Sequence, residues 1–498
     1  MFVGKMLIKE RTWRFYGMLI GWIIVAIYLN STEYGESGIR ELQEVEKRYV
    51  IDSITGHKTF YPVTRSDIVG ILCAIIGLMI AAGGGIGGGG MLVPIYVLVL
   101  GFEPKFAIPL SNVTVLGGAI TNVLMNAAKR HPLADRPLVD WDLLILMEPL
   151  TLAGALAGGF INKLAPEIVL TVMLVILLGL TTERTAKKGI KLYKKETEIK
   201  NAHLSKLAAE ASASQDAEAG EALLGADDNT EEDENPSSEE EKRKTIKIDP
   251  ELKNIIDEEK ETAPLWKVQV LLGMFILIVA INLAKGGGAF PSPLGIVCGS
   301  FLFWASTAFM FIALIGIAFY VRNYLVARTA DKDRLGYNYV DGDFHWDATS
   351  SLKYPAICFF AGMCAGLFGI GGGIVNGPLM LELGVLPPVA SATTACMILL
   401  TSTTAATTFI VFGLLAKDYG FHLFWVGVLA TAVGQLGMSY LIKKSGRQSY
   451  VAFSIGAVVG LSTILMGFHG LISLAYQRAD ADMPGTPHHR SGICQVGD

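Results

Sequence analysis

The chain has 498 residues, of which 51% are hydrophobic and 17% are charged. A soluble protein of this length usually carries more charge, and several apolar runs here reach the roughly 20 residues that span a bilayer. The net charge is −5, but residues 210–241 alone contribute −13, so the remainder carries the difference, +8. This composition predicts an all-α, polytopic membrane protein whose mildly basic membrane part either suits a carrier of anions or simply marks cytoplasmic loops.

The N-terminal region, residues 1–67, opens with a basic stretch and the short apolar run 15–29. Basic residues in front of an apolar segment keep the N-terminus in the cytoplasm. No small-x-small cleavage site follows, which favours an uncleaved anchor helix over a signal peptide. The polar residues 31–67 are therefore expected to form an extramembrane loop on the opposite side of the membrane.

The first transmembrane repeat, residues 68–182, opens on the apolar segment 68–101, which glycines interrupt. As one straight helix this segment would be about 51 Å long, against about 30 Å of hydrocarbon. Seven of the eight residues 83–90 are glycine, and glycine holds a helix poorly. The pattern predicts a helix over 68–82, an irregular turn and a half-helix over 90–100. Three further spans are predicted over 106–125, 141–161 and 166–180.

Residues 183–264 are polar, acidic and poor in aromatic residues. Such a composition cannot bury enough apolar surface to fold alone, so we expect an acidic, disordered cytoplasmic linker that starts with a short basic amphipathic helix. The rest of the chain is divided into connecting helices with a loop at 265–353, a second repeat at 354–475 and a tail at 476–498. Its spans are predicted over 266–283, 294–321, 354–383, 389–415, 421–442 and 451–474.

The glycine-rich break of the first repeat occurs a second time, about 284 positions later. Residues 85–89 and residues 369–373 both read Gly-Ile-Gly-Gly-Gly, and Pro94 aligns with Pro378. In both copies a Gly, a Pro and a small, hydroxyl-bearing segment follow. Two glycine-broken apolar segments in corresponding positions are the strongest sequence indication of a transporter's binding site.

Four clusters of Lys and Arg predict which loops face the cytoplasm. They lie at 129–136, 184–195, 322–334 and 443–447. All four fall on one side only if each glycine-broken element enters and leaves the membrane on the same side. Five full spans then separate the two elements, and an odd number inverts the second relative to the first. The predicted fold is therefore two inverted repeats, each with a glycine-broken re-entrant helical element.

The two glycine motifs predict an anion site near the membrane midplane. Glycine leaves backbone N–H groups uncovered, and the half-helices that follow add positive dipole ends. Two inverted copies bring both ends to one point without a fixed positive charge, and nearby hydroxyl and amide side chains add neutral donors. The predicted substrate-binding residues are Gly85, Gly87, Gly88, Gly89, Pro94, Ser111, Asn112, Thr114, Gly369, Gly371, Gly372, Gly373, Asn376, Pro378, Thr393 and Thr394.

Close helix packing remains the alternative explanation of the glycine runs. A nucleotide phosphate loop is disfavoured because no Lys-Ser/Thr follows the glycines. The threonines of 401–408 are interpreted as helix-packing residues. Catalytic patterns are missing: we find no Ser-His-Asp set and no paired catalytic carboxylates, and the cysteines show no metal-ligand spacing. We therefore expect neither an enzyme nor a metal or other cofactor.

Glu148, which precedes a proline, is the clearest ionisable residue inside a predicted span. Carboxylates within a membrane are costly and often functional. Glu148 is therefore a candidate for carrying a coupling proton. Capping a proline-broken helix and facing an aqueous vestibule are the alternatives.

At the two glycine motifs the chain resembles the sulfite exporter TauE/SafE family of membrane anion transporters, over roughly 68–180 and 354–475. The N-terminal extension and the long acidic linker look more like eukaryotic members than compact bacterial ones. The resemblance implies export or exchange of sulfite, sulfonates or related sulfur-containing organic anions, in the plasma membrane or an internal membrane.

Two other function classes stay open. An anion channel would use the same site without coupling, and a receptor or scaffold would bind partners through the linker without transport. The expected partners are a small anionic substrate, the lipid bilayer and a second copy of the chain in a homodimer, with no nucleic acid.

Overall fold

The computed structural model describes residues 60–82, 87–221, 250–340, 342–445 and 449–481. Within these ranges the chain is helical and forms no β-strand, apart from an isolated bridge between Arg130 and Pro137. Nine of the described helices are long and apolar enough to cross a membrane. The all-α prediction is confirmed, and the chain is a multi-pass integral membrane protein. The predicted N-terminal anchor lies outside the described residues.

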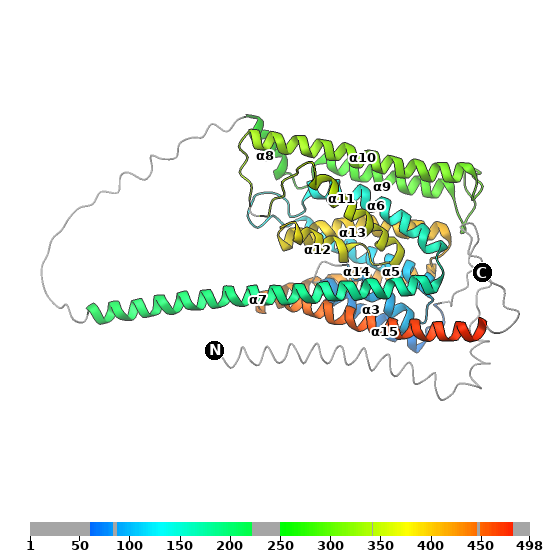
Figure 1. Ribbon diagram of the computed structural model, residues 1–498, viewed down its shortest axis with the longest axis horizontal. Coiled ribbons are helices and arrows are strands. Elements are labelled where there is room, and N and C mark those ends of the chain that lie inside the picture. The colour runs from blue at the N-terminus through cyan, green and yellow to red at the C-terminus, as the bar shows by residue number, and fades with distance from the viewer. Residues whose placement is uncertain (1–59, 83–86, 222–249, 341, 446–448, 482–498) are drawn as a thin grey trace.

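The helices form an elongated bundle (Figure 1). In chain order they are α3 (Arg65–Ala82), α4 (Gly89–Leu98), α5 (Pro104–Ala127), α6 (Trp141–Leu164), α7 (Glu167–Glu221), α8 (Pro250–Lys260), α9 (Leu265–Lys285), α10 (Phe301–Arg334), α11 (Ser350–Phe368), α12 (Gly373–Glu382), α13 (Pro387–Phe412), α14 (Lys417–Ser445) and α15 (Ser449–Ala481). The predicted helix over 68–82 and the half-helix over 90–100 are confirmed as α3 and α4. The second glycine break separates α11 from α12.

Helix α7 is longer than the sequence predicted, and it projects past the end of the bundle (Figure 1). We expected a span that ends near 180 and, from 183, a disordered linker with only a short basic amphipathic helix at its start. Residues beyond this point are rich in Ala, Glu and Lys, which favour helix. Lys187 also pairs with Glu183 at 2.5 Å, one helical turn away. Together with α8, regular structure therefore reaches further into the linker than its polarity indicated.

The helices of the two halves of the chain pack in a matching pattern. α3 packs on α14 as α11 packs on α6, and α5 packs on α14 as α13 packs on α6. α5 and α13 also contact each other, as do α7 and α15. These contacts match if α3 corresponds to α11, α5 to α13, α6 to α14 and α7 to α15.

Glycines bring α6 and α11 into direct backbone contact. A Cβ built on Gly154 of α6 would lie 1.9 Å from the carbonyl oxygen of Phe359, and one on Gly362 of α11 would lie 1.9 Å from that of Thr151. Only glycine fits at such separations, and small residues are what allow helices to pack closely inside a membrane. Some of the chain's glycines therefore serve helix packing, outside the two repeated motifs.

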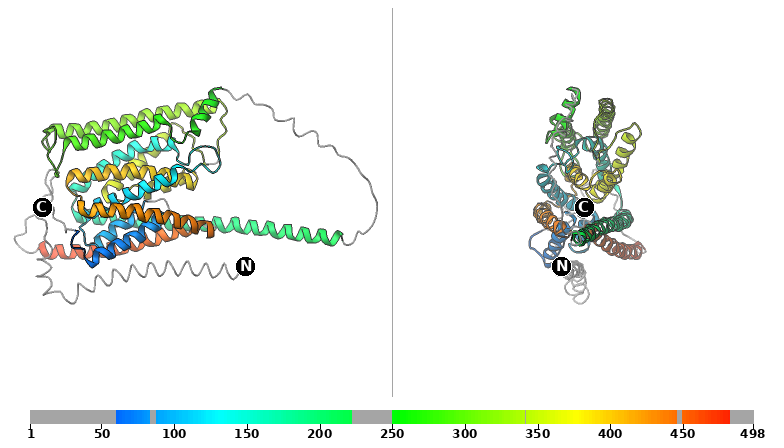
Figure 2. Two further views of the ribbon diagram at one scale, coloured as in Figure 1. Left: turned by 180° about the vertical axis from the view of Figure 1, so that it is seen from behind. Right: turned by 90° about the vertical axis from the view of Figure 1, so that its left-hand side faces the viewer.

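Helices α9 and α10 form a layer along one side of the bundle (Figure 2). Their inner faces carry the buried residues Met274, Ile278 and Met310, which join the core around α6 and α13. Large apolar side chains cover their outer faces: Ile276 is 55% exposed and Ile312 is 69% exposed. Such a surface is unfavourable in water and is solvated by lipid tails.

Candidate functional site

The two glycine motifs form left-handed turns. Gly87 and Gly88 have φ angles of 75° and 74°, and Gly371 and Gly372 have φ angles of 68° and 71°. A side chain is strained at such angles, which explains why glycine stands at all four positions. Gly88 and Gly372 are the N-caps of α4 and α12. Both copies of the motif therefore form a turn with the same backbone conformation.

The two short helices that follow correspond position by position. α4 begins at Gly89 and α12 at Gly373; each has ten residues, and the sixth is a proline, Pro94 or Pro378. Neither helix start has a side chain that bonds to it as a cap. The first N–H groups of a helix have no partner within the helix, so both starts offer donors. Gly85 lies outside the described residues.

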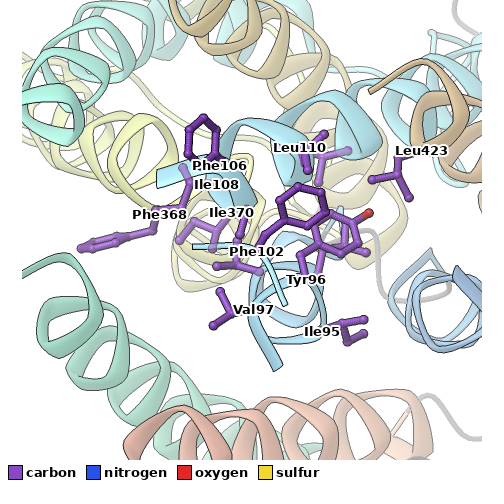
Figure 3. Packing of buried hydrophobic residues seen from close by; sticks show 14 of the residues in the cluster. Ile95, Tyr96, Val97, Phe102, Phe106, Ile108, Leu110, Phe368, Ile370 and Leu423 are labelled. Atoms are coloured by element: carbon purple, nitrogen blue, oxygen red, sulfur yellow. The ribbon is translucent and has the colours of Figure 1, made fainter. Parts of the chain in front are cut away.

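The two turns contact each other in the interior of the bundle. A Cβ built on Gly89 would lie 2.4 Å from the Cα of Ile370, and one on Gly369 would lie 2.6 Å from the carbonyl oxygen of Ile108. Ser111 of α5 donates a hydrogen bond of 2.8 Å to the carbonyl oxygen of Gly369. Ile108 and Ile370 lie close together in this buried cluster (Figure 3). The first copy of the motif is therefore packed directly on the second.

Two apolar residues lie against both turns. A Cβ built on Gly87 would lie 3.0 Å from the Cδ1 of Ile398, and one on Gly371 would lie 2.7 Å from the Cγ1 of Val115. Val115 comes from α5 and Ile398 from α13, the helices that follow the two half-helices. At these two glycines the surroundings are hydrocarbon, so polar groups have to lie elsewhere along the turns.

Two polar side chains lie beside Gly372. A Cβ built on Gly372 would lie 3.7 Å from the amide nitrogen of Asn376 and 4.0 Å from the hydroxyl oxygen of Thr401. The Asn376 amide nitrogen donates to the sulfur of Met397 at 3.9 Å, and its Oδ1 has no hydrogen-bond partner. Sulfur is a weak acceptor, so the Asn376 amide is held loosely.

Thr394 and Asn112 are also weakly bonded. The Thr394 hydroxyl donates to the sulfur of Met380 at 3.5 Å. The Asn112 amide donates to the carbonyl oxygen of Ile108 at 3.4 Å, and its Oδ1 is buried without a partner. Both side chains keep hydrogen-bonding capacity that a ligand can use.

Other predicted site residues are already engaged within the protein. The Thr114 hydroxyl donates to the carbonyl oxygen of Leu110 at 2.8 Å and lies 2.8 Å from the hydroxyl of Tyr96. Thr393 accepts a hydrogen bond of 2.9 Å from the backbone N–H of Asp140, at the start of α6. The structure therefore places Thr393 at the N-terminal end of α6 and not at the turns.

Comparison with known proteins gives a consistent family. A family model described as Sulfite exporter TauE/SafE matches residues 69–226. The chain is 29% identical to Sulfite exporter TauE/SafE family protein 5 of Arabidopsis thaliana, over 82% of this chain and 83% of that protein. It is 27% identical to family protein 3 of the same plant, over 92% of both chains. The chain is thus similar to proteins of the sulfite exporter TauE/SafE family over most of its length. No solved structure matches it.

The proteins that the chain resembles carry the name of a membrane transporter family and not that of an enzyme. In this chain Glu148 of α6 is fully buried, and neither carboxyl oxygen has a hydrogen-bond partner. A buried polar group without a partner is costly, so this exception calls for a functional explanation.

Three buried polar residues in this part of the chain were not among the residues predicted from the sequence. Thr401, which we interpreted as a packing residue, lies seven positions after Thr394 and so on the same face of α13; that spacing was the available signal. Tyr96 bonds α4 to α5. The Asn162 amide donates at 2.9 Å to the carbonyl oxygen of Leu367, just before the second turn. The last two depend on tertiary pairing and carry no sequence signal.

Proposed function

We propose that this protein is a secondary transporter, an exporter or exchanger, of small anions. The substrate class is sulfite, sulfonates and other sulfur-containing organic anions, because the curated relatives are named sulfite exporters. The anion binds near the membrane midplane, between the glycine turns and the polar side chains beside them. One observation carries the proposal: two matching left-handed glycine turns contact each other, and each opens a ten-residue helix.

The chemistry around the turns suits an anion that must also leave. The starts of α4 and α12 offer backbone N–H groups at positive dipole ends. Asn112, Asn376 and Thr394 are buried and weakly bonded, so recruiting them breaks little. Neutral donors bind an anion less tightly than a fixed positive charge would, so the anion can also dissociate. This combination supports binding that is reversible on the time scale of transport.

We further propose that the two halves are inverted repeats, with α3–α4 and α11–α12 as re-entrant elements. The matching helix contacts of the two halves support a repeat. Predicted cytoplasmic segments also meet: Arg130 donates to the carbonyl oxygen of Lys260 at 2.8 Å, and Arg136 pairs with Asp343. The inverted arrangement requires these segments to share one side of the membrane.

Uptake into proteoliposomes tests the proposal. Radiolabelled sulfite is offered with and without a pH gradient, and with and without unlabelled sulfite inside. Saturable uptake that internal sulfite accelerates identifies a carrier, whereas non-saturating flux identifies a channel. Gly88→Val and Gly372→Val are each expected to abolish anion binding and flux, because a side chain there strains the turn and covers its amides.

Matched controls separate strain from site chemistry. Gly101 and Gly384 also have positive φ, 74° and 87°, and a Cβ on either meets nothing within 4 Å. Gly101→Val and Gly384→Val therefore introduce similar strain away from the turns and are expected to keep anion affinity. If Gly88→Val or Gly372→Val kept wild-type affinity in a folded protein, a shared central site would be wrong and the turns would be packing elements.

A further inference from the structure

A charged cavity of about 70 Å³ lies away from the glycine turns, where the start of α6 meets α9, α10 and the loop before α6. Four cations line it, and each belongs to an ion pair. The cations are Arg136, Lys267, Arg328 and Lys332. Two of the four partners, Glu258 and Glu259, come from α8 and so from the linker, not from the membrane bundle.

The two carboxylates of α8 are each held by a cation and a neutral donor. Glu258 accepts from Arg328 at 2.7 Å and from the indole N–H of Trp266 at 3.1 Å. Glu259 pairs with Lys332 at 2.5 Å and accepts from the hydroxyl of Tyr337 at 2.6 Å. Without α8, four donors would remain in place around an empty position. Charged and neutral donors in this arrangement are what binds a carboxylate or an oxyanion.

Arg328 has capacity that α8 does not use. Its side chain is 10% exposed, and its Nε and Nη2 atoms are buried without a hydrogen-bond partner. Its Nη1 serves both Glu258 and the hydroxyl of Tyr324. Two nitrogen atoms of the Arg328 guanidinium are therefore available to a further acceptor. A guanidinium favours anions that accept two parallel hydrogen bonds.

The charge of the cavity changes sign with α8. The bundle supplies the four cations named above and three acids, Asp140, Asp142 and Asp343, which leaves +1. Glu259 of α8 also lines the cavity and brings the sum to 0, and counting Glu258, which pairs with Arg328 beside the cavity, makes it −1. The cavity therefore attracts small anions only when α8 is undocked or its carboxylates are neutral.

We propose that this cavity is a second anion-binding site, for a small oxyanion such as sulfite or sulfate, and that the two carboxylates of α8 compete with the anion for the cations Arg328 and Lys332. Docked α8 excludes the free anion, and the free anion displaces α8. The cavity adjoins the bundle at Asp140, whose backbone N–H bonds to Thr393 on the helix that carries Thr394. If the cavity serves as an entry to the central site, that role rests on the proposed transport function. Anion binding in the cavity is independent of that function.

Equilibrium binding of radiolabelled sulfate to the full chain in nanodiscs tests this inference. Glu258→Gln with Glu259→Gln keeps the shape of α8 and removes both charges. This double variant is expected to bind sulfate in the cavity at least about fivefold more tightly than the wild type, the lower end of usual coupling between two sites. Adding Arg328→Gln to it is expected to abolish the gain.

The matched control is Glu251→Gln on the same helix. Glu251 pairs with Arg334 at 3.1 Å, and both side chains are about two-thirds exposed, away from the cavity. This variant is expected to bind sulfate as the wild type does. Unchanged binding in the double variant overturns the cavity site, whereas a gain that survives Arg328→Gln places the anion elsewhere.

The central site is scored separately, with Gly372→Val. If Gly372→Val leaves wild-type binding unchanged while the Glu258→Gln/Glu259→Gln gain persists, the proposed central site fails and the cavity site stands. If Gly372→Val abolishes wild-type binding and the double variant shows no gain, the central site stands and the cavity site fails.

Discussion

Gly89 and Ile370 touch backbone to backbone. A Cβ built on Gly89 would lie 2.4 Å from the Cα of Ile370 and 2.7 Å from the carbonyl oxygen of Gly369. The two glycine motifs, far apart in sequence, hold each other in place at this contact. Gly89→Ala is therefore expected to lower the free energy of unfolding by about 1–3 kcal/mol, the usual cost of overpacking.

Thermal unfolding in nanodiscs measures this effect. Gly273→Ala on α9 is the control, because a Cβ there meets nothing within 4 Å. Alanine favours helix over glycine by about 0.5–1 kcal/mol, so Gly273→Ala is expected to be neutral or stabilising. Equal stability of the two variants would show that the turns do not pack as closely as described.

Thr394 and Ser111 are expected to behave differently although both carry buried hydroxyls. Thr394 donates only to a sulfur in the resting protein, so Thr394→Ala is expected to weaken anion binding by about 1 kcal/mol with little loss of stability. The Ser111 donor is already used on Gly369, so Ser111→Ala is expected to lower stability and leave affinity nearly unchanged. Binding isotherms and melting curves of both variants check this; the reverse result removes Thr394 from the site.

Glu148 is the candidate for proton coupling. Both of its oxygens are buried without partners, so it can gain or lose a proton without breaking a hydrogen bond. Glu148→Gln keeps the shape but cannot exchange a proton, and it is expected to remove the dependence of flux on a pH gradient while anion binding stays detectable. Glu183→Gln, at an exposed carboxylate of α7, is the control. Unchanged pH dependence in Glu148→Gln rules out the proton role.

Docking of α8 is expected to persist across neutral pH. Burial opposes the charge of Glu258, but the hydrogen bonds from Arg328 and Trp266 outweigh burial and hold the pKa of Glu258 below its usual value. A lowered folded-state pKa stabilises docking above the ordinary glutamate pKa of about 4.3, and this contribution is lost only as the pH falls through the lower folded-state value.

A spin label at Asn254 of α8 measures docking during a pH titration. Its mobility is expected to stay constant above the ordinary glutamate range and to rise in acid. A transition below the ordinary histidine pKa of about 6.5 but above the glutamate range would instead assign control to a group such as His131, whose pKa is lowered by burial and by Arg136.

The inverted arrangement predicts which segments share a side of the membrane. Single cysteines introduced in 31–59 and in 200–221 are expected to react with a membrane-impermeant reagent from opposite sides. The 129–136 loop is expected to react from the same side as 200–221. Labelling of both introduced positions from one side would reject the inverted repeats.

The sequence predicted the local structure of the turns better than their surroundings. A run of glycines disfavours helix, so the break between α3 and α4 followed from composition alone. That Gly87 faces Ile398 and Gly371 faces Val115 depends on the pairing of α5 with α13, which no local pattern encodes. The same holds for Thr393, which is adjacent to Thr394 in sequence but bonds to α6.

In the linker, composition did not distinguish the carboxylates that have fixed partners from those that are solvated. Its acidic residues indicated a solvated segment, and the charges of Glu258 and Glu259 looked the same as those around them. Their partners, Arg328 and Lys332, belong to the last turns of α10, where the sequence indicated only a cytoplasmic boundary. Charge alone does not distinguish a solvated carboxylate from one with a fixed partner, because the partner lies about 70 residues away.

The pairing of α6 with α11 has a consequence for how the protein is made. The ribosome completes α6 at Leu164 and begins α11 only at Ser350. At usual synthesis rates this interval is on the order of ten seconds or more. During it the glycine face of α6 has no native partner, so the nascent first half has to be sheltered in the membrane until the second half arrives.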